Sequence, residues 1–511
     1  MRVVLINPPR TNFDCEELAP PLGLIRLAQV ALRCGWQATI EDFNLLWHLD
    51  PALRASFYDT ALERLLDIDA SIYGFTSMAV DSHIALELSR RLKRVRPACQ
   101  VVLGGVHFSA IADRVAVLYP WVDVVLSGEA EQSFAEMLKP GTRVGSNDLQ
   151  LSPAVLDQLH LPGYFYVNPR RMLNFETGRG CIFKCAFCYS PGHYSAVRNF
   201  PIPQVLEQMS HLSEFGIKHV WFVEDNFLND RVRAKELCRQ LMHLESGITW
   251  SCYATFPQMN EDVIEMMGQA GCTEVFCGVD AVGTVAERAF QKAFLRGETP
   301  ITTKARQLTE AGIRPTFAFL VAPFSHEAGP GFDETVLAAL EARVAGAFTL
   351  LNPLSLYAGT VAYRRSDFRF EPDRLQAQIM MDLPDVAESN PFAESHPQLF
   401  PFHSRYVEEG EWQSFLLQTR CISTLLHCYP KTLALLRESR GTHPREVAHI
   451  TLQNFDDWAE VPKAEVRDVE RDVGFAVLEQ LCEGASEKRT LNSEYDSAEG
   501  RQPSVAGPSM M

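Results

Sequence analysis

The sequence predicts an α/β protein with two successive parallel sheets and a smaller, mainly helical carboxyl-terminal part. Short apolar runs alternate with helical periodicity over residues 2 to 139, and the alternation returns over residues 172 to 363. Gly35, Gly216 and Gly271 follow predicted helices, and glycine is common where helices end. The chain has 511 residues, 46% of them hydrophobic, which is enough for two or three separate cores.

The first block, residues 1 to 140, is predicted to be a doubly wound, Rossmann-like domain. We expect strands at 3–6, 37–41, 70–75, 101–103 and 122–126, and helices that include 22–34 and 82–95. In such sheets the ligand crevice lies beyond the carboxyl ends of the strands. Those ends carry the segments DFN (42–44), TSM (76–78), GGVH (104–107) and GEAE (128–131). The glycine pair at 104–105 permits close approach of a bulky or phosphate-bearing ligand or merely forms a tight turn, and the residues alone leave both readings open.

The second block, residues 172 to 364, is predicted to be a six-unit β/α partial barrel, reached through a connector at 141–171 with little periodicity. We expect strands at 172–177, 219–223, 249–254, 274–279, 315–321 and 348–354. Helices are expected at 203–215, 231–244, 261–270, 302–311 and 334–344. Right-handed crossovers curl such a sheet and place the chemistry at the carboxyl ends of its strands.

The rest of the chain loses this alternation. Residues 365 to 482 are predicted to form a small helical domain that contributes to substrate binding. Within it, residues 388 to 406 are rich in proline, histidine and aromatic residues. They would form an irregular lid with His396, His403 and Tyr406 as contacts, or an ordinary surface loop. The polar, glycine- and serine-rich tail at 483–511 is predicted to be disordered.

Composition limits the possible partners and the setting. A net charge of −17 argues against a nucleic-acid backbone as the main partner, because phosphate binding depends on lysine and arginine. No apolar stretch is long enough for a signal peptide or a membrane span, so we expect no membrane partner. Thirteen cysteines without an export signal indicate reduced thiols and a cytoplasmic location.

Three cysteines gather in the segment GRGCIFKCAFCYS, which spans residues 178 to 190. Cys181, Cys185 and Cys188 are soft thiolate ligands of the kind that hold iron–sulfur clusters. With only three such ligands, a cubane 4Fe–4S cluster keeps one iron open. The alternative is that the three thiols pack on one face of a buried helix. Gly178 and Gly180 favour a loop.

The spacing C-x3-C-x2-C, with Phe187 before the last cysteine, resembles the radical S-adenosylmethionine (radical SAM) family. The resemblance implies that the three cysteines bind the 4Fe–4S cluster, that its open iron chelates SAM, and that an electron donor such as flavodoxin or ferredoxin reduces it. It also implies a set of SAM contacts in the barrel: Phe187, Glu224, Asp225, Gly278 and Asp280.

The first block resembles the cobalamin-binding (B12-binding) domain found in one branch of that family. The matching segments are the NPP opening, APPLGLIRLAQVALRCGW, VVLGGVHFS and DVVLSGEAEQSF. The D-x-H-x-x-G motif of other cobalamin proteins is absent. The cobalamin contacts that the resemblance implies are Ser77, Met78, Gly104, Gly105, Val106, Gly128 and Glu129.

These resemblances imply a cobalamin-dependent radical SAM enzyme. The expected reaction is methyl transfer to an unactivated carbon of a natural product or peptide, through a 5′-deoxyadenosyl radical and methylcobalamin. The protein then mainly positions its cofactors and excludes water, so no side chain is singled out as a catalytic acid or base. Two alternatives stay open: a cyclase or rearrangement enzyme that does not methylate, and a cobalamin or redox sensor without turnover.

Overall fold

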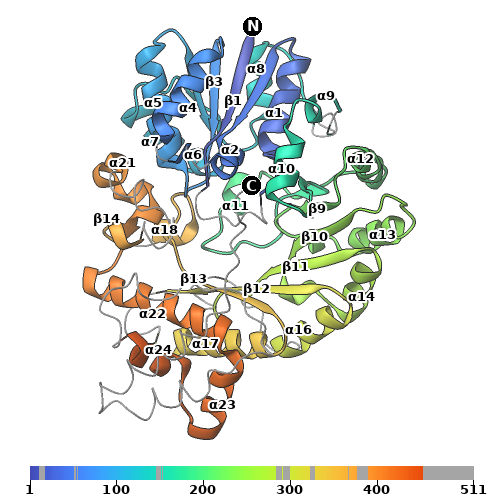
Figure 1. Cartoon of the computed structure of the whole chain (residues 1–511), viewed down its shortest axis with the longest axis vertical. Helices are drawn as coiled ribbons and strands as arrows, with labels where there is room; N and C mark the ends of the chain where they lie inside the picture. The colour runs from blue at the N-terminus through green and yellow to red at the C-terminus, as the bar shows by residue number, and fades with distance from the viewer. Residues whose placement is uncertain are drawn as a thin grey trace.

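The structure is a computed structural model that describes residues 1–10, 18–50, 53–54, 56–145, 151, 153–283, 291, 300–322, 329–365, 368–376 and 390–452. Figure 1 shows two α/β units, one above the other, with a helical layer beside the second. The tail predicted to be disordered, and residues 453 to 482 of the predicted helical domain, lie outside the described residues.

The amino-terminal unit is a five-stranded, all-parallel sheet in the order β2-β1-β3-β4-β5. Its strands are β1 (Arg2–Asn7), β2 (Gln37–Asp42), β3 (Ile72–Thr76), β4 (Gln100–Gly104) and β5 (Val124–Val125). Strand order reverses between β1 and β3, and in doubly wound sheets ligands bind at that reversal. The fold class predicted for this unit is confirmed.

Helices cover both faces of this sheet (Figure 1). They are α1 (Leu22–Arg33), α2 (Phe43–Leu49), α4 (Phe57–Asp67), α5 (Ser82–Val95), α6 (Val106–Ala110), α7 (Ala112–Leu118) and α8 (Glu131–Leu138). Helices were expected to fill the gaps between the strands, but α2 and α4 were not placed individually. Helix α2 begins where a ligand-crevice segment was predicted, because the Asp42 carboxylate accepts the N–H groups of Asn44 and Leu45 as a helix cap. Asp42 therefore has a structural role.

The second unit is a six-stranded parallel sheet in the order β13-β12-β11-β10-β9-β6. Its strands are β6 (Met172–Phe175), β9 (His219–Phe222), β10 (Thr249–Ala254), β11 (Cys272–Gly278), β12 (Arg314–Val321) and β13 (Phe348–Pro353). The helices that connect them are α12 (Ile202–Glu214), α13 (Arg231–Leu241), α14 (Glu261–Gln269), α16 (Ile301–Glu310) and α17 (Gly329–Val344). First and last strands lie at opposite edges, so this is a partial barrel, as predicted.

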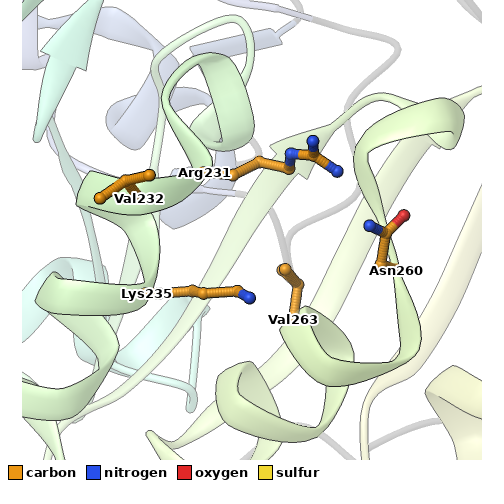
Figure 2. A pocket seen from close by; sticks show the side chains of 5 residues that line it. All are labelled: Arg231, Val232, Lys235, Asn260 and Val263. Carbon is orange, nitrogen blue, oxygen red and sulfur yellow. The ribbon is translucent and has the colours of Figure 1, made fainter.

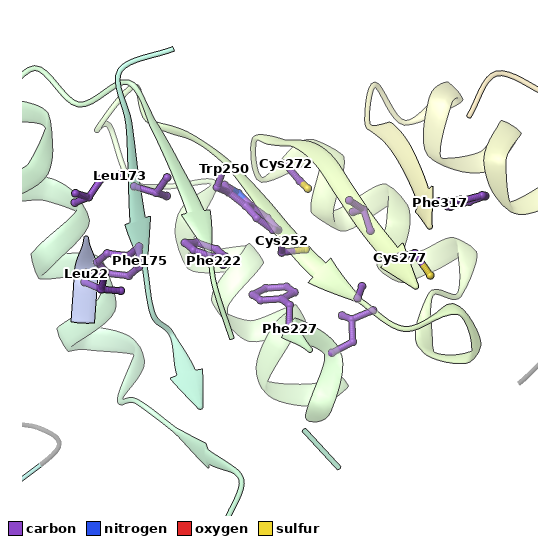
Figure 3. Close-up of a cluster of buried hydrophobic side chains, with 14 of the residues drawn as sticks. Leu22, Leu173, Phe175, Phe222, Phe227, Trp250, Cys252, Cys272, Cys277 and Phe317 are labelled. Atoms are coloured by element: carbon purple, nitrogen blue, oxygen red, sulfur yellow. The ribbon is translucent and has the colours of Figure 1, made fainter. Parts of the chain in front are cut away.

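An aromatic stack fills the core of the partial barrel (Figure 3). The rings of Phe222 and Trp250, from neighbouring strands, stack with centroids 4.9 Å apart. Trp250 also donates its indole N–H to the Ala270 carbonyl oxygen, 2.8 Å away, so its polar atom is satisfied inside the core. Cys252 and Cys272 lie in the same core as buried thiols.

The two units share one apolar core. Leu22 and Ile25 of α1 belong to the same cluster of buried side chains as Leu173 and Phe175 of β6 (Figure 3). Buried apolar contact of this kind holds neighbouring units in a fixed relation, whereas small polar interfaces permit relative motion. The first unit is therefore packed against the edge of the partial barrel.

The connector contains more helix than its composition indicated. It forms α9 (Pro153–Leu156) and α10 (Leu161–Val167). Tyr164 of α10 is buried and donates its hydroxyl to the Asp42 carboxylate, while Val155 and Leu156 join the core shared by the two units. Long-range contacts therefore order a segment whose local pattern is weak.

The carboxyl-terminal part packs in two places. Helices α22 (Glu409–Cys428), α23 (Pro430–Arg440) and α24 (Pro444–Leu452) lie against α17 and the edge strand β13. A second segment contains α18 (Val361–Arg365), β14 (Glu371–Pro372), α21 (Pro391–Ser395) and β15 (Ser404–Arg405). There Phe392 and Phe400 join the core of the first unit together with Tyr119. This segment thus links the partial barrel to the doubly wound unit (Figure 1).

Candidate active site

The cysteine segment follows β6, the first strand of the partial barrel. At positions 178 and 180 its backbone accommodates only glycine. Gly178 and Arg179 form β7, which pairs antiparallel with β8 (Arg198–Asn199). A Cβ at Gly178 would lie 2.7 Å from the Arg198 carbonyl oxygen, and Gly180 has a left-handed φ of +83°. Residues 181 to 189 have no helix, so the alternative of three thiols on one face of a helix is wrong.

The three cysteines are half-buried on this loop. The Phe183 N–H points to the Cys181 sulfur at 3.5 Å. Burial is the main cause that raises the pKa of the Cys188 thiol to about 12. The negative charges of Asp225, Cys185 and Cys181 also raise it, whereas the Ser190 backbone N–H lowers it. Thiols that raise one another's pKa favour a cation that stabilises their ionised form. The donor set fits an iron–sulfur cluster.

Among the described residues, no three His, Cys, Asp or Glu side chains lie close enough together to bind a single metal ion. This finding does not conflict with a cubane, in which each cysteine ligates a different iron. Sulfur ligands of a cluster are therefore spread more widely than those of one ion.

Three side-chain amides hold the cysteine loop from the barrel side. The Asn229 amide N–H donates to the Gly180 carbonyl oxygen at 2.7 Å, and its oxygen accepts the Ile182 N–H at 3.0 Å. Asn226 donates to Asn229 at 3.1 Å and to Gln258 at 2.7 Å. Asn226 precedes η3 (Phe227–Asn229) and Asn229 is its last residue, beyond the end of β9, and Gln258 ends η4 (Phe256–Gln258) beyond β10. Sequence reasoning did not single out Asn229, since nothing in one sequence links it to a loop almost fifty residues away.

We expect Asn229→Leu to weaken cluster retention. The variant removes both bonds to the loop and leaves the buried Gly180 carbonyl without a partner, which costs about 1–3 kcal/mol, whereas water can satisfy the exposed Ile182 N–H. Asn229→Asp keeps only the acceptor and should have an intermediate effect. Iron and sulfide retained after challenge with a chelator would measure this, with Asn352→Leu on β13 as the control. Equal retention in Asn229→Leu and wild type would contradict the role assigned to Asn229.

The two acids beyond β9 have different partners. Glu224 is buried and accepts the Thr177 hydroxyl at 2.5 Å, while burial raises the pKa of its carboxyl to about 7. Asp225 accepts the Tyr189 hydroxyl at 3.2 Å and the Ser190 hydroxyl at 2.9 Å, immediately after Cys188. Burial also raises the pKa of Asp225. Of these two predicted SAM contacts, Asp225 lies at the cysteine loop, and Glu224 supports the strand that leads into it.

The other predicted SAM contacts lie at the same edge. Phe187 is partly buried against the core. Gly278 ends β11, and Asp280 follows with a left-handed φ of +61°, which is uncommon for a residue other than glycine. The backbone N–H of Asp280 donates to the Ala318 carbonyl oxygen at 2.9 Å, which holds this turn against β12. Strained backbone of this kind is often found at ligand sites.

Five of the seven predicted cobalamin contacts lie at the carboxyl ends of β3 and β4, and Gly128 and Glu129 follow β5. Ser77 is buried, whereas 36% of Met78 is exposed. Gly105 has a φ of +92°, and a Cβ on it would lie 2.5 Å from the Ser77 carbonyl oxygen. Gly104 ends β4, and Val106 begins α6. The glycine pair therefore brings the loops after β3 and β4 into backbone contact. The tight turn is present, and it leaves room for the reading in which a ligand binds beside it.

Three buried imidazoles lie next to these loops, from His83, His107 and His403. The rings of His83 and His403 are 4.5 Å apart, edge to face. Burial lowers the pKa of His107 and of His403 to about 4, so both are neutral at pH 7. His403 and Tyr406 were predicted as lid contacts. The structure buries both, and the Tyr406 hydroxyl donates to the Leu354 carbonyl oxygen at 2.7 Å.

The two groups of loops meet directly. Helix α11 (Ser190–His193), which follows Cys188, packs on α6, which follows Gly105. The His193 carbonyl oxygen lies 3.5 Å from the Cβ position of Gly128. Helix α18, which follows the last barrel strand, also contacts the cysteine loop, because the Ala362 N–H donates to the Ala186 carbonyl oxygen at 2.8 Å. The cysteine loop is thus in contact with the edge of the doubly wound sheet.

Glu129 takes part in this junction as an ion-pair partner. Its carboxylate binds Arg179 at 2.8 Å and also pairs with Arg198. Burial opposes ionisation of Glu129, but these two arginines outweigh it, and the pKa of its carboxyl is lowered. Glu129 was predicted as a cobalamin contact, and its carboxylate lies at the interface with the partial barrel, bound to Arg179 and Arg198.

A shallow pocket of about 230 Å³ lies between the amino-terminal ends of α13 and α14 (Figure 2). It is lined by Arg231, Val232, Lys235, Asn260 and Val263. Small-molecule sites usually enclose about 300–1,000 Å³. Neither its size nor its place on the helical layer fits the predicted cofactor contacts.

Comparisons with known families agree with this arrangement. The radical SAM superfamily model matches residues 175–322, and the B12 binding domain model matches residues 14–138. The chain belongs to the cobalamin-dependent radical SAM family. The cofactors of this family are a 4Fe–4S cluster, SAM and cobalamin, as predicted.

Relatives of this family member are distant and differ in their reactions. The uncharacterized methyltransferase PH0819 of Pyrococcus horikoshii is 24% identical over 55% of this chain and 66% of its own length. Cytidylyl-2-hydroxyethylphosphonate methyltransferase of Streptomyces wedmorensis is 22% identical over 65% of this chain and 75% of its own. Anaerobic magnesium-protoporphyrin IX monomethyl ester cyclase of Cereibacter sphaeroides is 21% identical over 63% of this chain and 57% of its own length. The match therefore spans only about three fifths to three quarters of each relative.

A solved structure supports the fold along nearly the whole chain. The cobalamin-dependent S-adenosylmethionine radical enzyme OxsB, with aqua-cobalamin and S-adenosylmethionine bound, matches with a TM-score of 0.60 and 13% identity. The match covers 98% of this chain and 81% of OxsB. No helix in the described part of the chain has the length and apolar character needed to cross a membrane.

Proposed function

We propose that this chain is a radical SAM methyltransferase that transfers a methyl group to an unactivated carbon of a small molecule or peptide. The observation that carries the proposal is the packing of α11, directly after Cys188, on α6, directly after Gly105. One short helix thus separates the cysteine loop from the predicted cobalamin loops. That proximity suits a reaction in which two cofactors act on the same substrate atom.

When bound, the cluster and SAM supply a 5′-deoxyadenosyl radical, and cobalamin supplies the methyl group. The chain's own residues hold and enclose these groups. Cys181, Cys185 and Cys188 would ligate three irons, and Asp225 beside them offers a carboxylate to the SAM ammonium group. The segment that carries Phe392 and Phe400 covers the edge of the doubly wound sheet and limits water there.

The same site requires a one-electron donor, and we propose a flavodoxin or ferredoxin of a cytoplasmic, reducing setting. No nucleic-acid or membrane partner is part of the proposal. The alternatives predict different products. Similarity to the magnesium-protoporphyrin cyclase favours a non-methylating reaction as the second candidate.

Labelled SAM distinguishes these functions. The reconstituted protein would be given SAM with a deuterated methyl group, a reductant and extracts or candidate small molecules and peptides. Methyl transfer predicts one S-adenosylhomocysteine and one 5′-deoxyadenosine for each labelled product. Deoxyadenosine with an unlabelled, dehydrogenated or rearranged product would support the second candidate. Failure to form deoxyadenosine with any substrate would overturn both and leave the sensor alternative.

A further inference from the structure

We propose that Arg179 is a positioning residue that fixes the cysteine loop to the cobalamin-binding domain and so sets the relation between the two cofactor sites. Arg179 lies two residues before Cys181, and its side chain is only 8% exposed. Its guanidinium binds Glu129 at 2.8 Å and Glu131 at 2.6 Å, both at the end of the doubly wound sheet. It also binds Glu176 at 3.1 Å. The inference uses the family's cofactors and does not depend on the reaction proposed above.

Arg179 is the centre of a balanced network across the interface. Arg26 of α1 binds Glu176 at 2.7 Å, and Arg198 of β8 pairs with Glu129. Each domain therefore contributes arginine and glutamate, and the charges of the six side chains cancel. Networks of this kind add little stability compared with apolar packing, but displacing a buried member such as Arg179 leaves its charge without compensation, which disfavours other arrangements.

The backbone on each side of Arg179 transmits this constraint to both sites. On the barrel side, β7 is paired with β8 and Gly178 has no room for a side chain, so Arg179 cannot move without moving the cysteines that follow. On the other side, Glu129 follows Gly128, whose N–H donates to the Ser109 hydroxyl of α6 at 2.9 Å. Helix α6 begins directly after Gly105. The ion pairs thus join the two loops that carry the cofactor contacts.

The shared apolar core at α1 and β6 also holds the domains together. If this core rather than Arg179 fixed the spacing of the cofactor sites, the variants below would behave differently. If that core alone sets the geometry, removing the charges would alter stability but leave the spacing of the sites unchanged. If Arg179 sets the geometry, neutralising it would widen the range of distances between cluster and cobalamin while both cofactors remain bound.

The test is magnetic coupling between the reduced cluster and cob(II)alamin, measured by electron paramagnetic resonance in the full-length, reconstituted protein without turnover. We expect Arg179→Gln to broaden the distance distribution and to speed amide exchange at residues 128–131 by roughly tenfold or more. Glu131→Gln removes a 2.6 Å pair from the other domain and should broaden the distribution without altering the cysteine loop. Arg179→Lys should give a partial effect.

Arg314→Gln is the control for loss of an arginine away from the interface, since it breaks a 2.5 Å pair with Glu274 at the amino-terminal end of the barrel strands. It should leave the coupling as in wild type. A distribution in Glu131→Gln and Arg179→Lys as narrow as that of Arg314→Gln would overturn the proposal. These two variants decide the matter even if Arg179→Gln does not fold.

Discussion

Replacing Cys185 by alanine is expected to abolish formation of 5′-deoxyadenosine. Cys185 is the central cysteine of the loop, and no other thiol within the described residues of the loop could replace it, since Cys181 and Cys188 already serve as ligands in the proposal. A cubane with two protein ligands would be lost or would not chelate SAM productively. We expect activity to fall by about 10³-fold or more, as when an essential catalytic group is removed. Iron content and deoxyadenosine from SAM would measure the effect.

Cys421→Ala is the matched control for this experiment. Cys421 is a buried thiol on α22, and its S–H points to the Ala448 carbonyl oxygen at 3.8 Å. Its loss creates a small cavity and costs about 1–2 kcal/mol of stability, without removing a cluster ligand. Iron content should stay at the wild-type value. Deoxyadenosine formation by Cys185→Ala at the rate of Cys421→Ala would disprove the cluster assignment.

Replacing Gly105 by alanine is expected to abolish cobalamin binding while the iron content is retained. The residue has a φ of +92°, and the new Cβ would lie 2.5 Å from the Ser77 carbonyl oxygen and 2.8 Å from its nitrogen. Both neighbours are backbone atoms, so the two loops must separate. The left-handed conformation and the clash together cost about 3 kcal/mol or more. Absorption of bound cobalamin after gel filtration would report the loss.

Gly23→Ala controls for the general effect of adding a methyl group. Gly23 lies in helix α1 of the same domain, and no heavy atom is within 4 Å of its Cβ position. Alanine there should be neutral or should stabilise the domain by up to about 1 kcal/mol. If Gly105→Ala bound as much cobalamin as Gly23→Ala, the contact of the Gly104–Gly105 loop with cobalamin would be refuted.

Much of the fold could be predicted from the sequence because the signals are local. The alternation of strands and helices, with a glycine after many of the helices, predicted both sheets and the fold class. The spacing of Cys181, Cys185 and Cys188 indicated the cluster, since three ligands on one loop need no long-range contact to be recognised. Helix α2 was not placed individually and α10 was missed, because the Asp42 cap serves a short helix and Tyr164 is ordered by a distant residue.

The contacts across the site could not be predicted in this way. Asn229 and Arg179 act on partners about fifty residues distant, Gly180 and Glu129, and no periodicity or spacing in one sequence connects them. His403 and Tyr406 were predicted as lid contacts, whereas both are buried, because their burial depends on how the carboxyl-terminal segment folds back. Glu129 was identified by its place after a strand, and only the packed interface reveals its ion pairs.

The sequence by itself determined the two sheets and predicted the cysteine ligands and the glycines of the cofactor loops, because strand, helix and loop preferences act between near neighbours. Tertiary structure decided how the cysteine loop meets the doubly wound domain and which charges join them. The physical reason is that an ion pair or an amide clamp depends on the distance between side chains in space, which is set only when both units pack on their shared apolar core.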